Sequence, residues 1–186
     1  VDYGQRHRRE LLAAASVAEL YRAPHEVIEL PVSLMSGSSL TGGGDVPDGH
    51  YADPSMRSTV VPARNTLLLA VAAAVAVREK CHEIAYAAHA GDHAIYPDCR
   101  PEFISAFGGV LATCDYEPIQ LLTPFSNIDK TQIVRIGHSL AVPFARTWSC
   151  YKGGERHCGK CGTCVERIEA FKLAGIGDPT EYEVTL

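Results

Sequence analysis

The sequence lacks an excess of positive charge, and this limits the partners it can have. Its 17 lysines and arginines are outnumbered by 22 aspartates and glutamates, for a formal net charge of -5. A general nucleic-acid surface needs clustered basic residues. The one basic run, Gln5 to Glu10, also has the composition of the solvated start of a helix. We therefore expect no nucleic-acid partner.

A long hydrophobic run is also missing. The longest, Thr66 to Val77, has twelve residues, whereas a helix needs about 20 to cross a bilayer. We interpret this run as part of a buried helix and expect no membrane partner. No secretory-signal pattern opens the sequence.

The cysteine content does not suit a disulfide framework. There are seven cysteines, an odd number, and three of them form a C-x-x-C-x-x-C run. Metal-bound thiolates in a reducing compartment explain such a run better than disulfides do. We therefore expect a cytoplasmic chain.

The length and composition are those of one ordinary globular domain. The chain has 186 residues, of which 46% are hydrophobic and 21% are charged. This is enough to bury a core without covalent cross-links. We predict a single domain over residues 1–186, with residues 149–167 as a metal-binding segment.

Helical patterns and short apolar strands alternate along the chain. Helices are expected over 5–22, 63–79, 101–114, 129–140 and 165–175. Strands are expected over 25–32, 83–91 and 118–125. This alternation predicts an α/β fold with a parallel sheet and helices on both faces. In such a sheet, ligands bind beyond the carboxyl ends of the strands.

A Gly-, Ser-, Asp- and Pro-rich stretch, residues 33–55, predicts a long irregular excursion. Within it, "TGGGD" (Thr41 to Asp45) has the glycines of a phosphate-binding loop. It lacks the Lys and Ser/Thr of a Walker A loop. It also lacks a clear strand before it and a helix after it, so we interpret it as a flexible part of the excursion.

Four cysteines near the C-terminus have the spacing C-x7-C-x2-C-x2-C: Cys150, Cys158, Cys161 and Cys164. Each x2 step lets two sulfurs reach one ion through a tight turn. Four thiolates leave no open coordination position, which indicates a structural zinc. An iron–sulfur cluster also accepts four thiolates and remains the alternative. We expect Arg156, Lys160 and Arg167 to offset the negative charge.

The polar stretch "HAGDHAIYPDCRPEF" (His89 to Phe103) follows an expected strand. Its carboxylates could accept the N–H edges of a purine-like base, and its arginine could pair with a carboxylate. A polar turn with a helix cap is the alternative. Cys99 could act as a nucleophile, with His89 and His93 near in sequence. The site candidates in this loop are Asp92, Tyr96, Asp98, Cys99 and Arg100.

Two expected helix starts carry residues that suit an anion. Arg64 and Asn65 begin one helix, and Lys130 lies one residue into another. A helix N-terminus and a nearby cation both favour phosphate. Each is also compatible with an ordinary surface residue of a first turn.

Taken together, "DYGQRH", "VPARN", "GDHAIYPDCRPEF", "TPFSNIDK" and the cysteine run resemble the 7-cyano-7-deazaguanine synthase family. The resemblance spans nearly the whole chain, and "YPDCRPEF" with the cysteine spacing is its most specific part. It implies a Rossmann-like fold of the ATP-pyrophosphatase (adenine nucleotide alpha hydrolase-like) type with one bound zinc. It also implies ATP-dependent conversion of 7-carboxy-7-deazaguanine and ammonia to the nitrile, in queuosine or related deazapurine biosynthesis, by a homodimer.

The resemblance also implies roles for individual residues. The loop from Tyr96 to Arg100, with Asp92, would hold the deazaguanine. ATP with Mg²⁺ would be bound by Arg64, Asn65, Lys130, Tyr3, Gln5 and Arg6. The four cysteines would be zinc ligands. No catalytic residue is assigned.

The sequence departs from the family in one respect. The family's S-G-G-x-D-S pyrophosphate loop, expected after a first strand and before "DYGQRH", does not occur in these 186 residues. We therefore expect either a fragment or a protein without its main ATP-phosphate cradle. Two alternatives to the ligase follow: a zinc-stabilised deazapurine-binding module without catalysis, or a sibling ATP-pyrophosphatase that acts on another carboxylate or a tRNA base.

Overall fold

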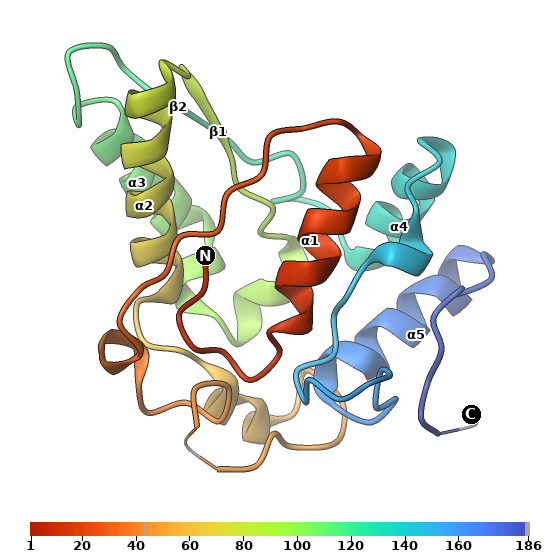
Figure 1. Cartoon of the computed structure of the whole chain (residues 1–186). Coiled ribbons are helices and arrows are strands. Elements are labelled where there is room, and N and C mark those ends of the chain that lie inside the picture. Colours follow the sequence, from red (N-terminus) through yellow and green to blue (C-terminus); the bar gives the residue numbers. More distant parts are fainter. Residues whose placement is uncertain (43, 185–186) are drawn as a thin grey trace. The chain divides into compact units, whose positions relative to one another are not determined.

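The structure is a computed structural model that describes residues 1–42 and 44–184 (Figure 1). The loop Thr41 to Asp45 therefore includes one residue, Gly43, that lies outside the described residues. The chain divides into two compact units. We call Ala63–Asp129 the strand unit, and Val1–Pro62 with Lys130–Leu186 the cysteine unit. The expectation of a single domain over 1–186 stays a prediction.

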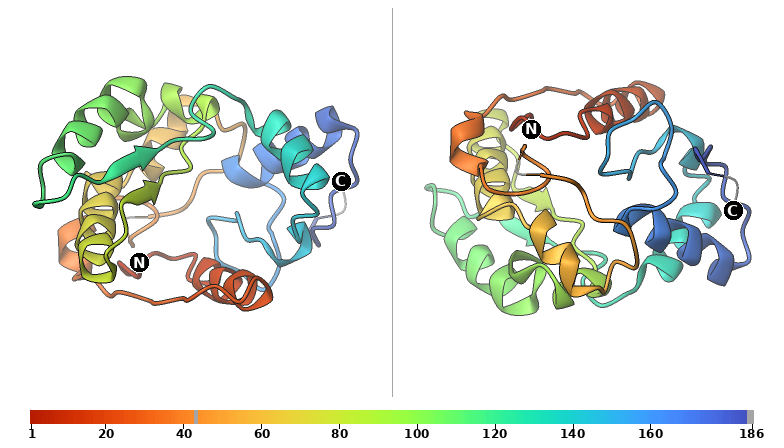
Figure 2. Two further views of the ribbon diagram at one scale, coloured as in Figure 1. Left: turned by 90° about the horizontal axis from the view of Figure 1, so that it is seen from above. Right: turned by 90° about the horizontal axis from the view of Figure 1, so that it is seen from below.

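The strand unit contains a small parallel sheet of β1 (Glu83–Ala85) and β2 (Gln120–Leu122). Ile84 pairs with Leu121 at the centre of the register. The ladder continues at both ends, where Gln120 N donates to His82 O at 2.8 Å and Tyr86 N to Leu122 O at 2.8 Å. The two strands run side by side in both views of Figure 2. The parallel α/β arrangement predicted from the sequence is thus confirmed in its coarse form.

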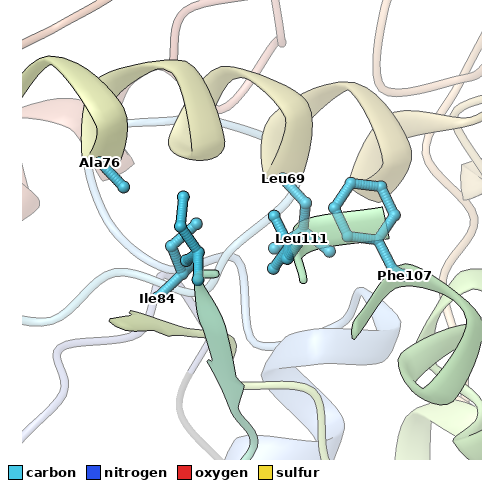
Figure 3. Packing of buried hydrophobic residues seen from close by; sticks show 6 residues of the cluster. Leu69, Ala76, Ile84, Phe107 and Leu111 are labelled. Atoms are coloured by element: carbon cyan, nitrogen blue, oxygen red, sulfur yellow. The ribbon is translucent and has the colours of Figure 1, made fainter. Parts of the chain in front are cut away.

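Two helices supply the core of this unit, α2 (Arg64–Glu79) and α3 (Pro101–Leu111). Leu69 and Ala76 of α2 point toward Ile84 of β1 and toward α3, as Figure 3 shows. Phe107 and Leu111 lie four positions apart, on one face of α3, and both are buried. This apolar contact holds the helices against the sheet.

Local sequence explains where these helices begin and end. Pro101 is the first residue of α3, where its missing N–H costs no hydrogen bond. α2 is capped by the next residue, Lys80, which adopts a left-handed conformation with φ of 55°. Cys81 N then bonds to Ala76 O at 2.8 Å. Two short 3₁₀ turns, η3 (Ala90–Ala94) and η4 (Pro97–Cys99), form the polar loop before α3.

The cysteine unit is built on α1 (Arg9–Leu20), α4 (Lys130–Ser139) and α5 (Gly162–Ala174). α4 and α5 pack side by side, as Figures 1 and 2 show. Val134, Ala170 and Phe171 are buried between them. Phe144, in the 3₁₀ turn η5 (Phe144–Arg146), meets Phe171 edge to face at 5.0 Å. The five helices predicted from the sequence are confirmed, with ends that differ from the prediction by at most four residues.

The irregular excursion, residues 33–55, is confirmed as irregular, but a few of its side chains are buried. It includes part of η1 (Val32–Met35) and leads into η2 (Pro54–Thr59). Met35 and Leu40 are 0% exposed. The Ser39 hydroxyl and backbone N–H both bond to Ser58 O, at 3.1 and 2.9 Å. Side chains of the excursion therefore form part of the core of the cysteine unit.

The strand predicted over residues 25–32 is wrong. This stretch makes one isolated parallel bridge, between Asp2 and Glu29. Asp2 N donates to Ile28 O at 2.8 Å, and Leu30 N donates to Asp2 O at 2.7 Å. Gly4 then turns the chain away with φ of 76°, so the pairing cannot extend past it. β-Branched residues alone do not make a strand without a partner of matching length.

The stretch Pro54–Glu79 has the length and mean hydropathy (1.8) of a membrane span, and 22% of its 18-residue apolar window is buried. It joins η2 to α2, with non-helical residues between them, and α2 itself has 16 residues. A core helix of a soluble protein passes the same test. The stretch is therefore weak evidence, and the expectation of no membrane partner stays a prediction.

Core packing in the strand unit predicts that Leu111→Ala greatly lowers the stability of the protein. Leu111 is 0% exposed, so its truncation leaves a cavity and should lower the free energy of unfolding by about 2–5 kcal/mol. Val110 is the matched control, because it is adjacent on the same helix and 54% exposed. Val110→Ala should change stability by about 0.5 kcal/mol or less. Urea unfolding of the two variants tests this, and equal midpoints would contradict the packing.

Candidate metal centre and ligand loop

The four predicted thiols come together in the cysteine unit. The Sγ atoms of Cys150, Cys158, Cys161 and Cys164 all lie within 4.8 Å of one another, and all four residues are buried. None is in a disulfide. A tetrahedral zinc with bonds of about 2.3 Å would place its sulfurs about 3.8 Å apart. The Cys158 and Cys164 sulfurs are 3.9 Å apart, so the cluster fits one metal ion.

Backbone N–H groups surround the sulfurs. Lys160 N and Cys161 N point at Cys158 Sγ from 3.4 and 3.3 Å, and Cys158 N points at Cys150 Sγ from 3.4 Å. Donors of this kind stabilise thiolates. Gly159, with φ of 73°, provides the turn that directs them. The x2 spacing therefore supplies both ligands and part of their electrostatic support.

Without a metal, the thiols compete for protons. Hydrogen bonds from Cys150 and then Cys164 lower the pKa of Cys161. The hydrogen bond with Cys161 in turn raises the pKa of Cys150 to about 11. Four adjacent thiolates repel one another, and a divalent cation is what lets all of them ionise together.

The basic residues expected to offset this charge are mostly paired elsewhere. Arg167 lies 3.4 Å from Asp178 and donates to Thr147 Oγ1 at 2.8 Å. Arg156 Nε lies 3.6 Å from a Glu181 carboxylate oxygen. The backbone N–H of Lys160, rather than its ammonium, contacts the cluster. The contacts therefore favour backbone amides, rather than these basic side chains, as the groups that offset the negative charge of the thiolates.

His157 is not one of the clustered ligands. Its Nε2 accepts a hydrogen bond from Ser149 N at 3.2 Å, and its ring packs on Trp148 with centroids 4.2 Å apart. Burial, and then the charge of Arg167, lower the pKa of His157 to about 4. A neutral, hydrogen-bonded imidazole supports the turn beside Cys158.

In the strand unit, the polar loop folds against the start of α2. Asn65 N donates to Asp98 Oδ2 at 3.0 Å, so an internal carboxylate takes the anion position at this helix N-terminus. Asn65 Nδ2 and Tyr86 OH both point at Cys99 Sγ from 3.4 Å. Tyr86 OH also donates to Asp98 O at 2.8 Å. Four side chains from three segments thus fix η4.

The remaining loop candidates flank this network. The Arg64 guanidinium lies over the Tyr96 ring, 6.0 Å from its centroid. Asp92 shares a capping box with His89 at the start of η3. Arg100 is exposed, and its Nε donates to His93 O at 2.9 Å. Arg64, Asn65, Tyr96, Asp98 and Cys99 are therefore brought together, while Asp92 and Arg100 are held by separate contacts.

Three other predicted nucleotide contacts lie at the start of the cysteine unit. Gln5 is buried, and its amide is fully used: Oε1 accepts from Tyr3 N at 2.9 Å, and Nε2 donates to Val1 O and Glu10 Oε1. Tyr3 is also buried. Arg6 is exposed and donates to Gly44 O at 2.8 Å. Gln5 therefore has a clear internal role in shaping this turn.

Lys130 is the first residue of α4, as predicted, and its ammonium forms an ion pair with Glu166 of α5. Glu166 is buried and was not identified from the sequence, nor was Tyr86. The available signal for Glu166 was its position, next to Arg167, two residues after the last cysteine of the cluster. For Tyr86, the signal was a polar-tipped aromatic at the end of a strand.

The buried environment predicts that Cys99 is unreactive. Burial raises the pKa of Cys99 to about 11, although the hydrogen bond with Tyr86 opposes this. Because the thiolate is the reactive form, iodoacetamide at pH 8 should label Cys99 at least about tenfold more slowly than exposed Cys81 and Cys114. The Cys99 rate should climb as pH rises from 9 to 11. Peptide mass spectrometry measures all three, and equally fast labelling of Cys99 in folded protein would restore the nucleophile hypothesis.

The cluster predicts one metal ion per chain in reduced, freshly purified protein. Cys161→Ser should abolish binding, since Cys161 is 0% exposed and inside the cluster. Cys81→Ser, at an exposed thiol outside it, is the matched control and should keep the metal. Elemental analysis gives the stoichiometry. An unchanged thermal transition after complete chelation would show that the metal does not hold this unit together.

Comparison with known proteins agrees with the resemblance. A family model described as "Queuosine biosynthesis protein QueC" matches residues 1–175. "7-Cyano-7-deazaguanine synthase 1" of Mesorhizobium japonicum is 55% identical, over 98% of this chain and 80% of the relative. The "7-cyano-7-deazaguanine synthase" proteins of Rhizobium etli and Rhizobium rhizogenes are 53% and 54% identical, each over 98% of this chain and 79% of the relative. By the extent of these matches, the chain belongs to the family of the queuosine biosynthesis protein QueC.

Proposed function

We propose that this chain is an enzyme, a 7-cyano-7-deazaguanine synthase, which converts 7-carboxy-7-deazaguanine and ammonia to the nitrile at the expense of ATP. The observation that carries this proposal is the family match over residues 1–175. Relatives of that name at 53–55% identity support it, and so does the four-thiol cluster. With it we propose the finer fold, a Rossmann-like ATP-pyrophosphatase domain.

The chemistry requires two activations. A carboxylate is a poor acyl donor, so ATP first transfers AMP to it and releases pyrophosphate. Ammonia then displaces AMP and leaves the primary amide. A second ATP adenylates the amide oxygen, and loss of AMP and protons gives the C≡N bond. The balance is two ATP to two AMP and two pyrophosphates, with the protein positioning reactants and stabilising charge.

We assign substrate recognition to the loop of the strand unit: Asp92, Tyr96, Asp98, Cys99 and Arg100. The contacts among Asn65, Tyr86, Asp98 and Cys99 support this, because they give the loop a fixed shape. A preorganised loop loses less conformational entropy when a ligand binds. The Tyr96 ring, with the Arg64 guanidinium over it, suits a flat heterocycle.

We assign ATP and its Mg²⁺ to Arg64, Asn65, Lys130, Tyr3, Gln5 and Arg6. Lys130 and Gln5 already make contacts within the chain, and these contacts limit how the two residues can bind ATP. Lys130 has to leave Glu166 to reach a phosphate, and Gln5 acts through the backbone it holds rather than through free amide groups. We also propose a cytoplasmic homodimer with Zn²⁺ in the cysteine cluster. Zinc there would hold the chain and take no part in the bond changes.

Product analysis is the direct test. The chain is incubated with 7-carboxy-7-deazaguanine, ATP, Mg²⁺ and ammonium, and mass spectrometry follows nitrile, amide and AMP. We expect nitrile and two AMP per nitrile. The zinc assignment is checked on the same preparation, since an iron–sulfur cluster would absorb visible light and zinc would not.

A second arm uses the chain extended upstream through an S-G-G-x-D-S loop, the phosphate-binding motif that the resemblance implies. This motif is not among the 186 residues. Nitrile from the extended chain alone would support the family assignment and locate the phosphate cradle in that loop. Deazapurine binding without product in both arms would favour the non-catalytic binding module. No binding in either would favour a sibling ligase with another substrate.

A further inference from the structure

A cavity of about 360 Å³ opens within the cysteine unit, away from every residue assigned above to substrate or ATP. Four separate stretches line it: the start of α1, η5 with the two residues that follow it, the arm between Cys150 and Cys158, and the C-terminal segment around Thr180. Its volume falls at the lower end of the range of small-molecule sites, about 300–1,000 Å³. The cavity is therefore large enough for a small organic ligand.

Three arginines on its lining come from three of these stretches. They are Arg9, Arg146 and Arg156. Two carboxylates, Glu155 and Glu181, also line it. The lining thus has a formal excess of one positive charge, in a chain whose overall formal charge is -5. This local reversal of sign favours an anion.

Two of the guanidiniums are available for a ligand. Arg9 lies over the Trp148 ring, 5.5 Å from its centroid, and Arg146 donates to Ser16 Oγ at 3.2 Å. Within the part of the chain that the structure describes, neither has a carboxylate partner. Arg156, in contrast, is near Glu181 at 3.6 Å. Arg9 and Arg146 are thus held in place by uncharged groups, with their charges still unmatched.

Trp148, which lines the cavity, is held in place by contacts within the chain. Trp148 Nε1 donates to Cys150 O at 2.9 Å, which satisfies the single polar group of the indole. The His157 ring packs against the indole, with the two ring centroids 4.2 Å apart. Trp148 therefore does not need a ligand to satisfy it, and it presents a rigid apolar surface beneath Arg9.

We propose that this cavity binds a small phosphate-bearing anion through Arg9 and Arg146. Guanidinium groups pair with phosphate oxygens through two parallel N–H···O bonds, which favours arginine over lysine at such sites. The volume leaves room for a group attached to the phosphate, against Trp148. Free phosphate and a nucleoside monophosphate share the required chemistry. The proposal does not rest on the synthase activity.

Trp148 provides a direct readout, because it is the only tryptophan in the chain. The metal-loaded 186-residue chain is titrated with inorganic phosphate and, separately, with AMP, at constant ionic strength. Indole fluorescence is followed, and calorimetry gives the dissociation constants. Equal affinities would identify the phosphoryl group as the ligand, and tighter AMP binding would identify a nucleotide.

Arg146→Ala and Arg9→Gln should each weaken binding at least about tenfold, the effect of losing one charge-assisted contact. Ser16→Ala removes only the support of Arg146 and should have a smaller effect. Arg57→Ala, at an exposed arginine of η2 outside the cavity, should change the dissociation constant less than about twofold. Nitrile formation should be unchanged in Arg146→Ala.

Metal content and circular dichroism confirm that each variant is folded. Binding that survives both arginine substitutions in folded protein would overturn the proposal. So would a fluorescence change that sodium chloride reproduces at the same ionic strength, since that would be ionic screening only. Failure here leaves the synthase proposal untouched, because the two use different residues and readouts.

Discussion

The constraint around which the cysteine unit is arranged is the four-thiol cluster, because its ligands come from separate segments that must meet at one point. It joins the arm after Trp148, the turn at Gly159 and the first turn of α5. Other backbone contacts gather around it: Asp48 pairs with Cys161, and His157 pairs with Tyr182. α1, in the same unit, has no buried residue. A closed metal site can add to the order that the apolar core between α4 and α5 supplies.

Close backbone packing makes this arrangement specific. A Cβ on Gly153 would lie 2.5 Å from Arg6 O, and one on Gly162 would lie 2.8 Å from Met56 Sδ. The glycines thus let the cysteine arm and α5 approach the N-terminal segment and η2. The spacing of the cysteines and the placement of these glycines have to agree for the cluster to close.

The strand unit is ordered differently, by apolar packing and a few polar contacts. Ile84, Leu69 and Leu111 hold the sheet and the two helices. The polar loop is then fixed by Asn65 and Tyr86, which reach it from α2 and from the end of β1. These contacts give the loop a fixed shape while it stays polar.

The sequence by itself determined the positions of the helices, the set of clustered thiols and the family. Apolar periodicity located the helices, the x7, x2 and x2 spacings selected the four thiols, and the "YPDCR" loop with the cysteine run identified the family. These features are local, so the chain carries them in its order. The sequence did not exclude a strand over residues 25–32, because pairing depends on a partner elsewhere.

Only the tertiary structure decided which polar groups are used up within the chain. It paired Lys130 with Glu166, used the amide of Gln5 internally and placed the Asp98 carboxylate at the start of α2. It also brought Arg9 to one cavity with Arg146 and Trp148, which lie more than a hundred residues further along the chain. Apart from those of Gln5, these contacts join residues more than thirty positions apart, and no local pattern specifies them.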